Sequence, residues 1–148
     1  MNPRPALLPP VTLRRYPHMH PADAHLWEQF LLSNPFPHAK IAYDVHVGTP
    51  PTLPPDTTAE LRKMAYALST RRIDAVAYLP DETIIIEVKP DAGVTAIGQV
   101  LCYTPLFHRE HPDSPKPIPA IVTDTAQRDI PWLCARYRIL LMELNPIP

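Results

Sequence analysis

The stretch RRIDAVAYLPDETIIIEVK, residues 71–89, decides what fold this chain adopts. It reads as two β-strands joined by the turn-forming residues of LPDE. Because side chains alternate between the two faces of a strand, Glu87 and Lys89 share the face opposite to Val88. A carboxylate and an ammonium are costly to bury, yet here they lie in the most apolar strand of the sequence. We therefore expect this strand to carry a functional site.

The turn between the two strands sets which residues face each other. With the turn centred on residues 81 and 82, antiparallel pairing places Asp74 opposite Lys89 and position 76 opposite Glu87. Asp74, Glu87 and Lys89 then project from one face, with the two carboxylates roughly 5–8 Å apart. A loop with an odd number of residues would turn Asp74 to the other face, so this expectation depends on the parity of the loop.

Two carboxylates at such a separation suit a divalent cation. Mg²⁺ takes one or two carboxylates and keeps several waters, so Asp74 and Glu87 are candidate ligands, with the backbone carbonyl of Val88 as a third. Lys89 would lie beside a water on the ion. A bound metal makes a nucleophile near neutral pH and stabilises charge on a phosphate. Together, Asp74, Glu87 and Lys89 predict phosphodiester hydrolysis. The alternative is that Asp74 and Lys89 form only a surface ion pair.

The same residues resemble a known superfamily. Asp74 followed by EVK at 87–89 is similar to the signature of the PD-(D/E)xK nucleases, which have the restriction-endonuclease-like fold. The residue before Asp74 is an isoleucine where the signature has a proline. Gln99 and Tyr103 resemble the Q-x-x-x-Y motif of the RecB-like branch, on the helix after the catalytic strand. The resemblance covers roughly residues 71–124.

The resemblance implies a metal-dependent nuclease with Mg²⁺ or Mn²⁺ as cofactor and DNA favoured over RNA as substrate. It implies that Gln99 and Tyr103 shape the site, and it makes Glu28 a candidate extra acid. Arg71 and Arg72, just ahead of the first acid, are candidate phosphate contacts. The alternative function is a non-catalytic nucleic-acid-binding or assembly protein on the same fold. A homodimer is left open.

Periodicity over the rest of the chain predicts a proline-rich arm, residues 1–21, followed by a single nuclease-like domain, residues 22–148. The segments with helical spacing of apolar residues are 22–33, 57–69, 93–104 and 129–136. The remaining strands are 39–47, 118–123 and 138–144. This order predicts an α/β fold, a mixed central sheet flanked by helices, that contains the restriction-endonuclease-like core with one helix inserted before the first acid.

Three expectations concern packing within these elements. The second predicted helix should turn its apolar side to the core, and that side consists of Leu61, Met64, Ala65 and Leu68. Strand 39–47 should keep its large apolar side chains on one face, namely Ile41, Tyr43, Val45 and Val47. Pro105 should end or kink the third helix.

Composition excludes several classes of protein. The 148 residues carry a formal net charge of −1, so any nucleic-acid binding must come from a local cluster of cations. The seven histidines have no cysteine pair beside them, which disfavours a zinc site. The sequence shows no apolar run of membrane-spanning length and no signal-peptide core. We therefore expect a cytoplasmic protein without a membrane partner.

Overall fold

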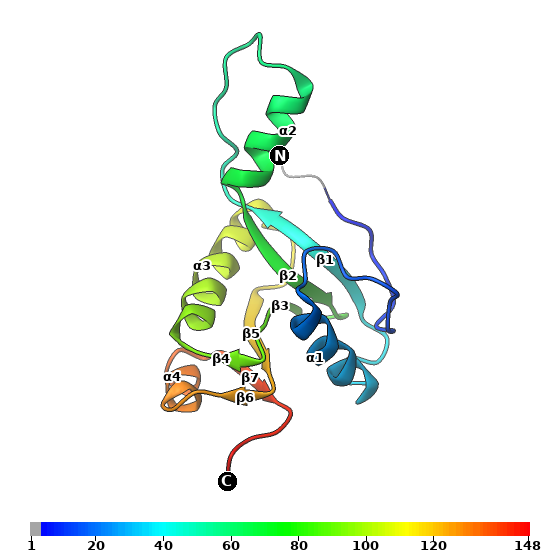
Figure 1. Cartoon of the computed structure of the whole chain (residues 1–148), viewed down its shortest axis with the longest axis vertical. Coiled ribbons are helices and arrows are strands. Elements are labelled where there is room, and N and C mark those ends of the chain that lie inside the picture. The colour runs from blue at the N-terminus through cyan, green and yellow to red at the C-terminus, as the bar shows by residue number, and fades with distance from the viewer. Residues whose placement is uncertain (1–3) are drawn as a thin grey trace.

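A mixed five-stranded β-sheet forms the centre of the protein, for which a computed structural model describes residues 4–148 (Figure 1). The strand order is β1-β2-β3-β5-β7. The strands are β1 (Lys40–Val47), β2 (Arg71–Tyr78), β3 (Thr83–Val88), β5 (Pro117–Thr123) and β7 (Leu140–Glu143). The first three pair antiparallel, and β3, β5 and β7 pair parallel. The predicted α/β fold with a mixed sheet is therefore confirmed.

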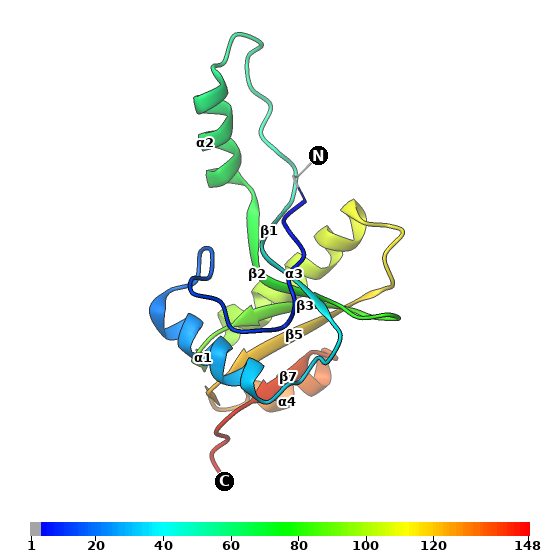
Figure 2. The same ribbon diagram turned by 90° about the vertical axis from the view of Figure 1, so that its right-hand side faces the viewer.

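Helices flank this sheet, with α1 and α3 on opposite faces (Figures 1 and 2). The helices are α1 (Pro21–Leu32), α2 (Ala59–Ser69), α3 (Val94–Glu110) and α4 (Ile130–Arg136). A short parallel pair, β4 (Asp91–Ala92) and β6 (Thr125–Ala126), lies beside the sheet and was not predicted. Within residues 4–148, no helix combines the length and the apolarity needed to cross a bilayer.

Strand β3 is the most deeply buried element of the sheet, because all six of its residues are buried. Ile84, Ile86 and Val88 belong to the apolar cluster under α1, whereas Ile85 belongs to the cluster on the α3 side. The predicted alternation along this strand is confirmed. Glu87, two residues after Ile85, therefore points to the α3 side of the sheet.

Strand β1 does not keep its apolar residues on one face, so that prediction was wrong. Ile41 and Tyr43 pack in the cluster under α1, whereas Val45 and Val47 pack in the cluster on the α3 side. Asp44, between the two pairs, adopts a positive φ of 52°. This left-handed residue interrupts the regular alternation of the strand.

Helix α3 does not end at the predicted proline but continues for five residues beyond it, to Glu110. Pro105 lacks the N–H that would continue the helical hydrogen bonds. Phe107, in the turn that follows, is fully buried. Burial of this ring offsets the cost of the proline and keeps the last turns helical.

Helix α2 has no buried residue, so the predicted core side of this helix faces solvent instead. The exposed fractions are 54% for Leu61, 58% for Met64 and 80% for Leu68. The helix and the loop before it project well beyond the sheet (Figures 1 and 2). The prediction assumed that an apolar helical face must find the core of its own chain.

The proline-rich N-terminal arm lies against the domain over its described part. Leu8 pairs with Ile41 at the outer edge of β1. Tyr16 is buried, meets the ring of Tyr43 edge-on, and accepts a hydrogen bond from the Leu13 N–H at 2.8 Å. The arm thus covers one edge of the sheet, while residues 1–3 lie outside the described residues.

Candidate metal-dependent active site

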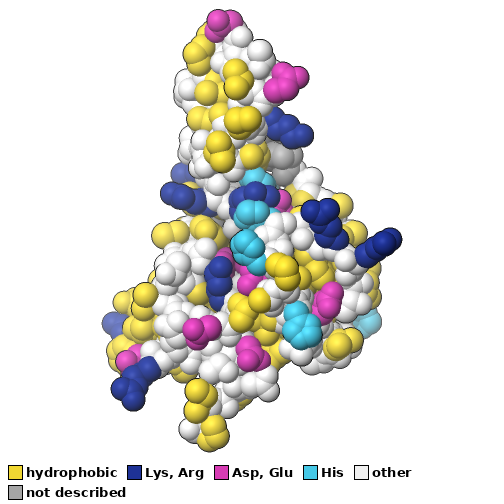
Figure 3. Space-filling model, viewed as in Figure 1, with side chains coloured by type: hydrophobic (Ala, Val, Ile, Leu, Met, Phe, Trp, Pro, Cys, Tyr) yellow, Lys and Arg dark blue, Asp and Glu magenta, His cyan; other side chains and the backbone are white. Residues whose placement is uncertain are grey.

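A cleft of about 400 Å³ brings together most of the residues that the sequence singled out. We call it the acid cleft; the predicted residues that line it are Arg71, Arg72, Asp74, Glu87, Lys89, Gln99 and Tyr103. Its other lining residues are His18, His20, Asp23, Ala67, Leu68 and Thr70. Figure 3 shows histidine, basic and acidic side chains gathered near the middle of this face of the molecule.

The hairpin that carries the two acids has a register two residues away from the predicted one. Tyr78 pairs with Thr83 and Ala75 with Ile86, and Leu79 N–H donates to the Glu82 carbonyl at 2.9 Å. The turn is therefore centred on positions 80 and 81. Pro80 favours this placement, because the fixed φ of proline suits the first central position of a turn. Because the register shifts by an even number of residues, position 74 stays on the predicted face of the sheet. It lies opposite position 87 rather than position 89.

Asp74 replaces a backbone partner where β2 and β3 separate. The pairing of the two strands stops at Ala75 and Ile86. One residue further, Asp74 Oδ2 accepts a hydrogen bond of 2.8 Å from the backbone N–H of Val88. This bond fixes the carboxylate beside the end of β3. That the backbone carbonyl of Val88 binds a metal stays a prediction.

Glu87 is the buried acid of the cleft, with only 3% of its side chain exposed. Its Oε2 atom has no hydrogen-bond partner within the described residues. Lys89 Nζ lies 3.9 Å from Glu87 Oε1, and the lysine side chain is 38% exposed. A buried carboxylate oxygen without a partner is costly, so the site is stabilised by any cation that reaches it.

The two carboxyl groups titrate as a pair because they lie close together. Burial, followed by the charge of Asp74, raises the pKa of Glu87 to about 8. Burial also raises the pKa of Asp74, to about 6, although the hydrogen bond from Val88 and the charge of Lys89 oppose it. Such a pair retains a proton near neutral pH. A divalent cation would displace that proton and remove the repulsion.

Helix α3 supplies two further groups to the acid cleft. Gln99 Nε2 lies 3.4 Å from the hydroxyl of Tyr103, one turn along the same helix face. Gln99 Oε1 is buried and has no hydrogen-bond partner among the described residues. The amide therefore has an unused, buried acceptor beside the cleft, and a donor that reached it would satisfy it.

The two arginines ahead of the first acid have different surroundings. Arg72 makes a bidentate ion pair with Asp44, with both N···O distances at 2.6 Å. This pairing raises the pKa of Arg72 and commits its guanidinium to β1. Arg71 is exposed at the rim. Of the two, Arg71 is the better placed to contact a phosphate.

The acid that α1 brings to the cleft is Asp23, not Glu28. Asp23 stands in the first turn of α1 and lines the cleft, and its charge contributes to the raised pKa values of Asp74 and Glu87. Glu28 lies outside the cleft, in a surface hollow beside the N-terminal arm. The sequence signal was the position of Asp23 in the first turn of the predicted helix, which the periodicity argument overlooked.

The acid cleft fits a hard divalent ion. The unpartnered Oε2 of Glu87 and the proton-retaining pair it forms with Asp74 both favour a bound cation. Residues 4–148 contain no ready-made cluster of three His, Cys, Asp or Glu side chains for a metal. The ligand set would thus be two carboxylates completed by waters, as Mg²⁺ commonly has.

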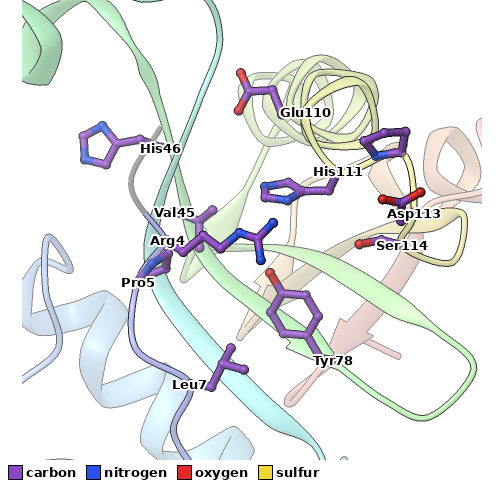
Figure 4. A pocket seen from close by; sticks show the side chains of 11 residues that line it. Arg4, Pro5, Leu7, Val45, His46, Tyr78, Glu110, His111, Asp113 and Ser114 are labelled. Carbon is purple, nitrogen blue, oxygen red and sulfur yellow. The ribbon is translucent and has the colours of Figure 1, made fainter. Parts of the chain in front are cut away.

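A second cavity, of about 500 Å³, is lined by His46, whose hydrogen-bond partner Thr70 lines the acid cleft. The hydrogen bond between His46 and Thr70 is 2.7 Å long, so the two cavities are neighbours. Figure 4 shows the Arg4 side chain pointing between His111 and Tyr78. Arg4 is exposed, and the lining of this cavity does not include Asp74, Glu87 or Lys89.

Comparison of the chain with protein-family models, with curated proteins and with solved structures finds no match.

Proposed function

We propose that the protein is a metal-dependent nuclease that uses Mg²⁺ or Mn²⁺ to hydrolyse phosphodiester bonds, with DNA favoured over RNA. The observation that carries the proposal is the pair Asp74 and Glu87 with Lys89 beside it, on neighbouring strands of one cleft. A surface ion pair does not explain a glutamate that is 3% exposed. The likeness to the PD-(D/E)xK nucleases is part of the same proposal.

Each residue of the acid cleft has a distinct role in this proposal. Asp74 and Glu87 would hold the ion, and Lys89 would donate a hydrogen bond to the attacking water. When bound, the ion supplies charge neutralisation at the phosphate and a lowered pKa for water. Gln99 and Tyr103 would position the water or the substrate from α3.

The substrate would enter along the exposed rim of the cleft. Arg71, His18 and His20 line the cleft and are exposed, so they are free to meet phosphate oxygens. Arg71 thus offers a local positive charge, although the net charge of the chain is −1. Cys102 and Cys134 are free thiols, which agrees with the proposed cytoplasmic setting.

Substitution of Lys89 gives the decisive test. Lys89→Ala should abolish cleavage of linear, circular, single-stranded and branched DNA in Mg²⁺ or Mn²⁺, while calorimetry still detects Mn²⁺ binding. Asp74→Ala should abolish both cleavage and Mn²⁺ binding. The matched control is Lys116→Ala, because Lys116 is an exposed lysine in the loop before β5 and away from the cleft.

Two results would contradict the proposal. Cleavage by Lys89→Ala at the wild-type rate would make the lysine an ion-pair partner only. Wild-type protein that binds DNA but neither binds Mn²⁺ nor cleaves any substrate would favour the alternative, a non-catalytic nucleic-acid-binding or assembly protein on this fold.

A further inference from the structure

The projecting arm, residues 49–70, consists of a proline-rich loop and α2, and it meets the acid cleft only at its base, where Ala67, Leu68 and Thr70 line the cleft. Its apolar stripe consists of Leu61, Met64, Ala65 and Leu68, and the three larger side chains are each more than half exposed. Figure 3 shows hydrophobic side chains along this projection. Because no other described element covers the stripe, it is a candidate interface.

Hydrogen bonds join the loop of the projecting arm to α2. Arg62 binds three carbonyls of the preceding loop, those of Pro54, Pro55 and Thr57, at 2.8, 3.0 and 3.1 Å. Thr58 caps the helix by accepting a hydrogen bond from the Leu61 N–H. These bonds hold the loop against the helix and leave the apolar stripe uncovered.

The base of the arm prevents the stripe from turning toward the body of the protein. Tyr66 stacks on His46 of β1 with ring centroids 5.0 Å apart, and Thr70 is hydrogen-bonded to the same histidine. At 100° per residue, Tyr66 lies about 150° from the centre of the stripe. The side of α2 that is anchored is thus nearly opposite to the side that is apolar.

Charge and pattern identify the partner. The arm carries two acidic and two basic residues, so its net charge is zero, unlike a surface that binds a phosphate backbone. The stripe is self-complementary in an antiparallel pair of α2 helices. Leu61 would meet the partner's Leu68, and Met64 would meet the smaller side chain of the partner's Ala65.

We propose that α2 is a homodimer interface, in which two copies of the chain pack their stripes antiparallel about a twofold axis near Met64 and Ala65. Such an interface is isologous, with the same patch used twice. An 11-residue helix falls short of the ~800 Å² per partner of a stable complex, so the dimer is weak and concentration-dependent. Ala67 and Leu68 also line the acid cleft, so the partner helix would border the cleft.

Sedimentation of the full chain over about a hundredfold range of concentration tests the dimer. Wild type should pass reversibly from monomer to dimer. Leu61→Glu/Leu68→Glu should stay monomeric with an unchanged Tm, because neither residue is buried. Leu32→Glu, at a 77% exposed position of α1, is the matched control and should still dimerise. A wild type that stays monomeric, or a stripe variant that dimerises as well as the control, overturns the proposal.

Disulfide trapping tests the geometry in a Cys102→Ser background. Met64→Cys should cross-link to itself, since two copies of this position lie near the axis. Leu61→Cys alone should not, because its two copies lie about 10 Å apart along the helices; Leu61→Cys/Leu68→Cys should. Cross-linking of Leu61→Cys alone would overturn the antiparallel pairing. Neither experiment needs nuclease activity, so both are independent of the proposed function.

Discussion

Helices α2 and α3 have similar sequence patterns but opposite surroundings. Each places apolar residues at helical spacing. α3 buries four of them against the sheet, namely Ala96, Ile97, Val100 and Phe107. α2 buries none. An apolar face along a helix therefore does not establish that the helix packs on the core of its own chain.

The difference follows from the strands that each helix connects. α3 joins β3 to β5, which are parallel neighbours, so the chain must cross back over the sheet and the helix packs on it. α2 lies between β1 and β2, which are antiparallel neighbours and need no crossover. Nothing draws α2 onto the sheet, and it projects beyond the strand ends (Figure 2).

The largest expected effect is on the buried side of this comparison. Phe107→Ala in α3 removes a fully buried ring and should reduce the free energy of unfolding by about 3–5 kcal/mol. Denaturant unfolding monitored by circular dichroism measures it. A loss below about 1 kcal/mol would mean that the last turns of α3, beyond Pro105, contribute little to the core.

The next effect concerns charge buried beside α3. Glu87 has a pKa raised from 4.5 to about 8, so the folded state holds a proton that the unfolded chain releases. Stability should therefore fall as the pH rises from about 5 to about 8. Glu87→Gln should remove the part of this slope that lies above about pH 6 and should stabilise the protein at pH 8, measured by denaturant unfolding at each pH.

A metal titration complements that measurement. Mn²⁺ at pH 8 should raise the Tm of wild type and leave the Tm of Glu87→Gln nearly unchanged, because the ion replaces the proton at the carboxyl pair. Glu143→Gln, at the edge strand β7, is the control and should respond as wild type does. Asp74, whose pKa is raised to about 6, accounts for a slope below pH 6, so a slope between pH 6 and 8 that survives in Glu87→Gln would show that the Glu87 carboxyl is not its source.

The two faces of α3 should separate activity from stability. Gln99→Ala, on the face toward the cleft, should lower cleavage by roughly ten- to a hundredfold and change the free energy of unfolding little. Ile97→Ala, on the buried face, should cost about 2–5 kcal/mol through a cavity and should leave the proposed cleavage by the folded protein unchanged. Equal effects of both substitutions on stability would contradict this division.

The smallest effect is expected in α2. Leu61→Ala should change the free energy of unfolding by no more than about 0.5 kcal/mol at low protein concentration, because its side chain is already exposed. Denaturant unfolding at two protein concentrations measures it. A loss comparable to that of Phe107→Ala would show that α2 packs on its own chain and would contradict the contrast between α2 and α3.

Local periodicity was sufficient for much of the site. The alternation along β3 placed Glu87 on the correct face, and helical spacing placed Gln99 and Tyr103 together. These relations depend only on the geometry of one strand or one helix, which the sequence determines directly. The parity of the hairpin loop extended the argument to Asp74, although Pro80 moved the register by two.

Contacts between distant segments were decided only by the tertiary structure. Arg72 turned to Asp44, 28 residues away, and the first turn of α1 brought Asp23 rather than Glu28 to the cleft. The exposure of the apolar stripe of α2 was also decided by the tertiary structure. A pattern repeated along one element fixes directions within that element, whereas partners across the fold depend on how the chain connects the strands, which no local pattern encodes.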